Sequence, residues 1–270
     1  MLCLDKRISG SVEVFFVSDR GGVPDTSKPM AGCVAKLLAA GFGAEFLLAD
    51  YWNANSPVSD STINEMAEIC AGADLLTIHT CVFKWAPDEL RKEILTAVRL
   101  GVKQIVIHPY ALGLDIQGCN PSRTEVRDLC KYALDNGVRL AVENLGKTGI
   151  ISIRRALDIV GSDPDTTGLG VCVDTGHAYR SCAIDGIPPI AFIEEFRDQI
   201  IELHIDDNFG DEDLHLPPGE GSIDWPPILD AISHLRPDTV ICLEIRSNGD
   251  PIETIRASRD FLLATSIVNS

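Results

Sequence analysis

The sequence lacks any run long enough to cross a membrane and any cysteine pattern typical of a structural zinc site. No segment approaches the roughly 18–20 consecutive apolar residues that a membrane helix needs. The first ten residues lack the basic-then-apolar order of a signal peptide. The nine cysteines are odd in number, scattered, and form no C-x-x-C pair. Free thiols fit a reducing compartment, so we expect a cytoplasmic protein with no membrane partner.

Basic residues are also scarce. Against 40 Asp and Glu there are only 23 Lys and Arg, which gives a formal net charge of −17. Affinity for nucleic acid rests on cationic side chains that neutralise phosphates, so this balance argues against a nucleic-acid partner. A local basic cleft can still lie on an acidic protein. The 45% of hydrophobic residues is typical of an ordinary globular chain with a full core.

Eight apolar runs rich in β-branched residues recur along the chain. They lie at residues 12–18, 44–50, 74–80, 104–110, 139–145, 170–176, 201–207 and 240–246. Segments with helical periodicity lie between them, for example at 87–101, 125–137, 189–200 and 250–266. Strands that alternate with helices indicate a parallel sheet, and about 250 residues is the usual length of a closed barrel of eight such units.

This organisation predicts one domain over residues 1–270, an α/β protein folded as a single (β/α)8 TIM barrel. A doubly wound open sheet is the alternative. It is weakened because VSDRGGVPD, not a G-x-G-x-x-G turn, follows the first run. Gly101 and Gly137 are expected to end helices. Cys172 and Cys242 lie inside apolar runs and are expected to be buried.

A polar side chain stands at or near the C-terminal end of each of the last six runs. These residues are His79, His108, Glu143, Asp174, His204 and Glu244. In a TIM barrel the C-terminal ends of the strands converge on one cavity, where active sites are built. A single histidine there is more often a hydrogen-bonded core residue than a ligand. An ionised carboxylate is rarely buried unless it is paired or binds metal, so three carboxylates and three histidines on six successive runs predict a divalent-metal site.

Two further clusters extend this set. His177 follows Asp174 by three residues, across a glycine turn at the rim of the barrel. Asp213 and His215 form a D-x-H pair in the acidic loop after the seventh run. Read alone, that loop is equally well explained as a solvated surface loop. The three residues are therefore candidates for additional metal or substrate contacts.

The ligand types restrict the ion. Carboxylates and imidazoles without thiolates suit Zn²⁺, Mn²⁺, Co²⁺ or Mg²⁺, and the sequence leaves the choice open. Asp206 lies two residues after His204 and points the same way along the strand, so it could orient a ligand. Arg246 is a second candidate for this outer shell. Trp85 and Trp225 could wall the site, although filling space between loops and helices is the simpler interpretation.

The succession IHT…IHP…VEN…VDTGH…LHIDD…DLHLPPGEGSIDW…LEIR resembles the xylose isomerase-like TIM barrels over residues 74–246. That group includes sugar isomerases and epimerases of the tagatose 3-epimerase type, hydroxypyruvate isomerases, inosose dehydratases and the zinc AP endonucleases called endonuclease IV. In the sugar epimerases a single metal is held by Glu, Asp, His and Glu. The matching positions here are Glu143, Asp174, His204 and Glu244.

The resemblance to the epimerases implies a metal-dependent isomerase or epimerase acting on a small sugar or hydroxy-ketone. The reaction would pass through an enediolate, with Glu143 and Glu244 as its acid and base. His177 matches a histidine that contacts substrate. His215 stands where these enzymes often have an Arg, which leaves the sugar specificity open. Barrels of this group often pair, so a homodimer is an expectation, and a dehydratase is an alternative reaction.

The resemblance to endonuclease IV implies a different activity, because three zinc ions are held there by nine residues and all nine positions are filled here. One ion would be held by His79, His108 and Glu143, the second by Glu143, Asp174, His204 and Glu244, and the third by His177, Asp213 and His215. The mouth loops, however, offer few cations for DNA, namely Lys84, Lys147, Arg180 and Arg246. A zinc-dependent AP endonuclease is therefore the alternative activity. A metal-binding barrel without turnover is a third class, weakened by the presence of both glutamates.

Overall fold

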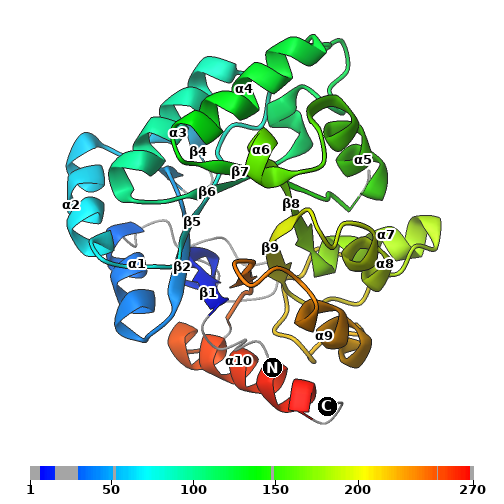
Figure 1. The fold of residues 1–270 in the computed structure, drawn as a ribbon. Coiled ribbons are helices and arrows are strands. Elements are labelled where there is room, and N and C mark those ends of the chain that lie inside the picture. Colours follow the sequence, from blue (N-terminus) through cyan, green and yellow to red (C-terminus); the bar gives the residue numbers. More distant parts are fainter. Residues whose placement is uncertain (1–6, 16–29, 51–52, 147–148, 248, 268–270) are drawn as a thin grey trace.

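The protein is described by a computed structural model that covers residues 7–15, 30–50, 53–146, 149–247 and 249–267. Eight parallel strands close into a barrel in the order β1-β10-β9-β8-β7-β6-β5-β2. Helices surround the strands on all sides (Figure 1). Closure depends on β1 (Ile8–Ser11), which pairs with both β2 (Gly43–Leu47) and β10 (Val240–Leu243). The predicted (β/α)8 barrel is confirmed.

The other barrel strands overlap the predicted apolar runs. They are β5 (Leu76–His79), β6 (Gln104–Ile107), β7 (Arg139–Glu143), β8 (Leu169–Asp174) and β9 (Ile200–Ile205). Of these, β8 and β9 each begin one residue before the predicted run. These strands are nearly continuous in buried residues, as expected for a sheet that is covered on its outer face by helices. A small antiparallel pair, β3 (Ala49–Asp50) with β4 (Asn53–Pro57), follows β2 and was not predicted.

The prediction of a first strand at 12–18 is wrong. Residues Val12–Phe15 form a 3-10 turn, η2, and 16–18 lie outside the described residues. The strand is instead Ile8–Ser11, whose small residues Ser9, Gly10 and Ser11 hide it from a search for bulky apolar runs. The turn that follows is buried, and a short buried apolar run cannot be told from a strand by periodicity. Gly10 packs closely here, because a Cβ would lie 2.9 Å from Leu37 Cδ2 and that side chain would have to shift.

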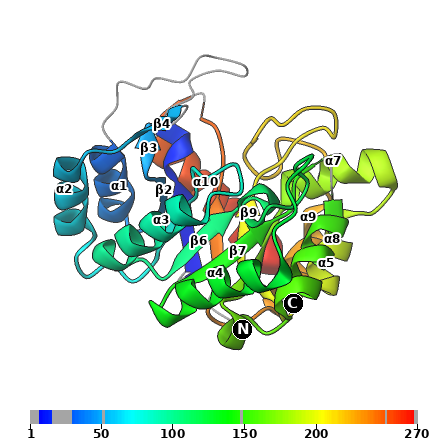
Figure 2. The same ribbon diagram turned by 90° about the horizontal axis from the view of Figure 1, so that it is seen from above.

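The helices that connect the strands form the outer layer (Figures 1 and 2). They are α1 (Met30–Ala39), α2 (Asp60–Cys70), α3 (Pro87–Leu100), α4 (Arg123–Asp135), α5 (Gly149–Val160), α6 (Pro164–Thr167), α7 (Thr175–Asp185), α8 (Pro189–Glu195), α9 (Trp225–Ser233) and α10 (Pro251–Ile267). A further 3-10 turn, η3, spans Pro109–Leu112. The helix predicted over 189–200 ends at Glu195, because β9 already begins at Ile200.

Local signals explain where these helices begin and end. Pro87 opens α3, and Gly101 ends it with a left-handed φ of 75°. Ser122 and Glu125 form a reciprocal capping box at the start of α4, and Gly137 follows that helix with φ 76°. No described helix is long and apolar enough to cross a membrane.

The inside of the barrel is partly polar. Branched aliphatic residues usually dominate the interior of a TIM barrel. Here buried Glu45, Thr77, Gln104 and Glu202 lie on barrel strands. Cys172 and Cys242 are fully buried, as predicted. A polar interior directly below the strand ends is unusual and belongs to the site described next.

Candidate metal centre

Four side chains from four successive strands meet at the mouth of the barrel. Glu143, Asp174, His204 and Glu244 each offer one ligand atom, and these atoms all lie within 4.8 Å of one another. Glu143 and Asp174 end β7 and β8, His204 lies in β9, and Glu244 directly follows β10. His204 Nδ1 is 2.8 Å from Glu244 Oε2 and 3.6 Å from Glu143 Oε1. We call these four residues the central group.

Burial and mutual charge perturb the central group. Burial, together with the negative charges of Glu143 and Glu244, raises the pKa of Asp174 from 3.8 to about 7. Burial acts on Glu143 too, but hydrogen bonds from four histidines hold the pKa of its carboxyl well below the usual range. Burial is likewise outweighed at Glu244, where His204 lowers the pKa to about 2. Three carboxylates thus face one imidazole.

This donor set fits a divalent cation. Asp174 Oδ2 and His204 Nδ1 are buried, and neither makes a well-aligned hydrogen bond within the described part of the chain, although His204 Nδ1 lies close to Glu244 Oε2. A buried polar atom without a partner is costly, and carboxylates gathered in the interior are stabilised by a metal ion. Carboxylate oxygens and imidazole nitrogens are ligands of Zn²⁺ and Mn²⁺. The central group would hold the ion.

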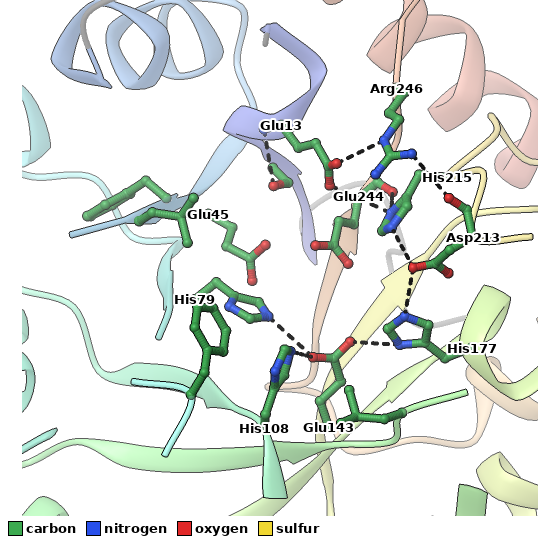
Figure 3. Close-up of a pocket in the computed structure, with 15 residues that line it drawn as sticks. Glu13, Glu45, His79, His108, Glu143, His177, Asp213, His215, Glu244 and Arg246 are labelled. Atoms are coloured by element: carbon green, nitrogen blue, oxygen red, sulfur yellow. Dashed lines mark hydrogen bonds and ion pairs between the residues drawn. The ribbon is translucent and has the colours of Figure 1, made fainter. Parts of the chain in front are cut away.

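Two histidines join the central group on one side. His79, which ends β5, and His108, which follows β6, place their Nε2 atoms 3.2 Å and 3.1 Å from Glu143 Oε2. Figure 3 shows both rings pointing at this carboxylate. Burial opposes protonation of His79, yet the hydrogen bond to Glu143 raises its pKa from 6.5 to about 9. Burial lowers the pKa of His108.

A second flanking set lies on the opposite side of the pocket. His177, in the first turn of α7, and His215, in the loop after β9, both turn Nε2 toward Asp213. The distances to Asp213 Oδ2 are 3.3 Å and 3.5 Å (Figure 3). His215 has a left-handed φ of 49°, an uncommon conformation for a residue other than glycine. The structure therefore brings all nine predicted donors to one mouth.

The two predicted outer residues act on the loops that carry these donors. Asp206 Oδ1 accepts a 2.8 Å hydrogen bond from the Gly176 amide, which anchors the start of α7. Arg246 Nη1 donates to the Asp213 carbonyl at 3.1 Å, and Arg246 Nε donates to Glu13 Oε1 at 3.0 Å. Asp206 makes no described hydrogen bond to a central-group side chain, so its role as an orienting residue stays a prediction.

Sequence analysis missed two carboxylates of the mouth, Glu45 and Glu13. Glu45 lies on β2 and is 1% exposed, and Glu13 lies on η2 and is 4% exposed. Each interrupts an apolar run, AEFLLAD and VEVFF respectively. The same argument that selected Glu244, a carboxylate inside an apolar run, applies to both and could have found them.

The mouth encloses a cavity of about 270 Å³. Its polar lining includes Glu143, Glu244 and four of the histidines, and its apolar lining includes Phe46, Phe83 and Leu145. Trp225 does not line it, because its indole is buried and donates to Asp207. Phe83, which is 47% exposed and lies 5.1 Å from the His108 ring, supplies an aromatic wall instead.

The cations near the mouth are already paired. Lys84 lies 3.2 Å from Glu89, Arg180 lies 3.4 Å from Asp213, and Arg246 pairs with Glu13. Lys147 lies outside the described residues. A surface that binds a polyanion needs an excess of positive charge. At the described rim each of these three cations is neutralised by a neighbouring carboxylate.

The structure is a (β/α)8 barrel with carboxylates and histidines gathered at its C-terminal mouth. The model of the xylose isomerase-like TIM barrel family matches residues 34–265. The chain therefore belongs to that family.

Curated proteins are similar in sequence to part of the chain. An uncharacterised protein of Methanocaldococcus jannaschii is 26% identical over 184 residues, 64% of this chain and 61% of the relative. A probable endonuclease 4 of Thermoplasma acidophilum is 31% identical over 159 residues, 53% of each chain. The chain thus spans little more than half the length of these relatives.

Two solved structures share the fold. A D-tagatose 3-epimerase-like protein is 20% identical, with a TM-score of 0.70 over 97% of this chain and 98% of that one. The IOLI protein, solved with a bound zinc atom, is 17% identical, with a TM-score of 0.66 over 96% and 99% of the chains. At such identities the likeness concerns the fold.

Proposed function

We propose that the protein is a divalent-metal-dependent isomerase or epimerase that acts on a small sugar or hydroxy-ketone. The observation that carries the proposal is the placement of Glu143 and Glu244. Both belong to the central group, and both line the same cavity of about 270 Å³. Two carboxylates from well-separated strands, β7 and β10 in the barrel order, can reach one small substrate from two directions.

The reaction needs one carboxylate that removes a proton from the substrate and a second carboxylate that returns a proton to it. A divalent cation in the central group would polarise the substrate carbonyl as a Lewis acid. Glu244, whose pKa is lowered to about 2, is ionised at neutral pH and can accept the α-proton. Glu143 on the other side is also ionised, so it would return a proton that it takes from its hydrogen-bond partner His79, whose raised pKa of about 9 keeps that ring protonated at neutral pH, and Glu244 would release its own proton to solvent. Return to the opposite face of the same carbon gives epimerisation, return to the neighbouring carbon gives isomerisation, and loss of a β-hydroxyl gives dehydration.

The size, lining and rim charge of the cavity favour a small substrate that is not a polyanion. Its volume of about 270 Å³ lies just below the usual range for sites that bind drug-sized ligands. Phe46, Phe83 and Leu145 can cover the apolar face of a sugar while the carboxylates and histidines meet its hydroxyl groups. The paired cations at the rim leave little positive charge for a nucleic-acid backbone.

Phosphodiester hydrolysis at abasic sites is the second candidate. It is favoured by the flanking sets, since His79 and His108 group with Glu143, and His177 and His215 converge on Asp213. Together with the central group they supply donors for three ions. The similarity to a probable endonuclease 4 also favours it.

The experiments that separate these candidates use the same protein preparations. A panel of ketoses is incubated with the protein and Mn²⁺, Co²⁺ or Zn²⁺ in deuterated water, and an abasic-site duplex is incubated in parallel. Deuterium at the α-carbon of one ketose is the expected result, and chelator should abolish it. Metal-dependent nicking of the duplex without deuterium exchange, together with about three zinc ions per chain, would replace the proposal with the second candidate.

A further inference from the structure

The histidine rings of the mouth are oriented by hydrogen bonds to groups behind them, on the side away from the pocket. Three of them place Nδ1 against a backbone carbonyl oxygen and turn Nε2 toward a carboxylate of the pocket. These pairs are His79 with Thr80 at 3.1 Å, His177 with Asn144 at 3.0 Å and His215 with Glu244 at 3.0 Å. A carbonyl can only accept, so Nδ1 must carry the proton, and Nε2 is left as the nitrogen that can bind an ion.

His204 is turned the other way round. Its Nε2 points away from the central group and lies 3.0 Å from Glu45 Oε2, while Nδ1 faces the central group. Both side chains are buried, with exposures of 0% and 1%. The acceptor behind His204 is therefore a carboxylate, whereas the acceptors behind the other three rings are carbonyls.

Glu45 is held in place for this contact. It lies on β2, and its other oxygen, Oε1, accepts a weak 3.6 Å hydrogen bond from Cys242 Sγ. The second carboxylate of the barrel interior, Glu202, is occupied elsewhere, because its Oε2 accepts from Gln104 Nε2 at 2.7 Å. The two buried glutamates thus have different partners, and only the Glu45 carboxylate accepts a described hydrogen bond from a central-group residue.

We propose that Glu45 is a positioning residue for the metal centre: its carboxylate accepts the Nε2 proton of His204 and keeps Nδ1 bare toward the ion. The inference rests on the proposed metal site of the central group. A carboxylate behind a ligating imidazole fixes its tautomer and increases its basicity, and loss of such a partner typically weakens metal binding about 10- to 100-fold. Backbone carbonyls cannot be removed by substitution, so Glu45 is the orienting acceptor that mutagenesis can change.

The first test is metal affinity in Glu45→Gln, a substitution of nearly unchanged size that removes the charge. We expect Zn²⁺ affinity, measured by competition with a chromophoric chelator, to fall about 10- to 100-fold. The matched control is Glu202→Gln, which removes an equally buried carboxylate from the same barrel interior. Its affinity should stay within about threefold of the parent. Unchanged affinity in Glu45→Gln, or equal losses in both variants, would overturn the inference.

The second test does not depend on the variants folding. In the zinc-loaded parent protein, ¹⁵N NMR of the histidine side chains should show His204 with a proton on Nε2 and none on Nδ1. A proton on Nδ1 with a bare Nε2 refutes the role of Glu45. If the parent protein binds no zinc, the proposed function fails by itself. The Nε2 proton, slowed in exchange by Glu45, is then sought in the metal-free protein, and its absence refutes the contact.

Discussion

The two ends of the barrel use the same kinds of charged residue in opposite ways. At the N-terminal end, Arg139 and Arg236 bridge Asp165 and Asp238 with distances of 2.9–3.2 Å. Two cations match two anions there, and the side chains are 21–55% exposed. In the central group at the C-terminal mouth, three carboxylates face one histidine, and Glu143, Asp174 and His204 are almost fully buried.

The difference shows what identifies a functional cluster in this fold. Exposed, balanced ion pairs contribute little and need nothing else. Buried carboxylates in excess are unfavourable unless a cation completes them, and residues with perturbed pKa values gather at functional sites. The central group has more carboxylates than cationic partners, whereas the ion pairs at the opposite end match two anions with two cations. Four measurements test whether this contrast is real.

The largest effect is expected from Glu143→Gln at the mouth. Removing a carboxylate that is proposed both to bind the ion and to transfer the proton should lower kcat by about 10²- to 10⁴-fold. The rate of deuterium incorporation into the responding ketose measures it. Asp238→Asn at the opposite end is the control and should leave that rate unchanged. Full activity in Glu143→Gln would show that the assignment of acid and base is wrong.

Removing the metal should lower the thermal stability, and this effect should depend on the central group at the mouth. An ion present at about 100 times its dissociation constant stabilises the folded state by about 2.7 kcal/mol. For a chain of this size that corresponds to a rise in Tm of about 5–10 °C, measurable by scanning calorimetry with and without chelator. Asp174→Asn should lose most of this shift, while Asp238→Asn should keep it. An equal shift in both variants contradicts a metal site in the central group.

The two ends of the metal-free protein should lose stability at opposite limits of pH. The folded pKa of His79 is raised from 6.5 to about 9. Its pairing with Glu143 is therefore fully stabilising below pH 6.5 and is lost as pH rises through 9. Partial burial opposes the shift at Asp238, but Arg236 and Arg139 lower its pKa below 3.8, so its contribution is lost only as pH falls below that value.

The measurement is Tm against pH in the presence of chelator. We expect Tm to fall between pH 6.5 and 9, with a change in stability of at most about 2–3 kcal/mol. His79→Gln should flatten this alkaline decline, and Asp238→Asn should leave it intact. A Tm that rises over the same interval would mean that the histidines are not paired with carboxylates in the metal-free protein.

The smallest effect is expected from Asp238→Asn itself. Its side chain is 49% exposed and solvent screens its ion pairs, so the free energy of unfolding should fall by less than about 1 kcal/mol. Urea unfolding at neutral pH measures the change, and metal affinity should be unaffected. A loss as large as that caused by removing the metal would remove the contrast between the two ends.

Much of the fold was predictable because hydrophobic periodicity is local. The seven later strands coincide with apolar runs, and Gly101 marks a helix end that depends on its own left-handed conformation. The first strand, Ile8–Ser11, was missed because its small residues make contacts that only the closed barrel creates, such as that of Gly10 near Leu37. Among site residues, carboxylates and histidines at strand ends could be recognised one by one.

Contacts between distant strands could not be predicted in this way. Glu45 and His204 are 159 residues apart, and nothing in either segment indicates that they share a hydrogen bond. The orientation of the His204 ring depends on that bond. Likewise, the convergence of His177 and His215 on Asp213 depends on how the loop after β9 folds back over the mouth.

By itself, the sequence determined that strands and helices alternate eight times and that acidic and imidazole side chains end most of the strands, because both patterns lie within short segments. Only the tertiary structure decided which of these side chains share a centre, which nitrogen of each histidine faces it, and which buried carboxylate stands behind His204. Those outcomes depend on barrel closure and strand register, which bring together groups that no local pattern relates.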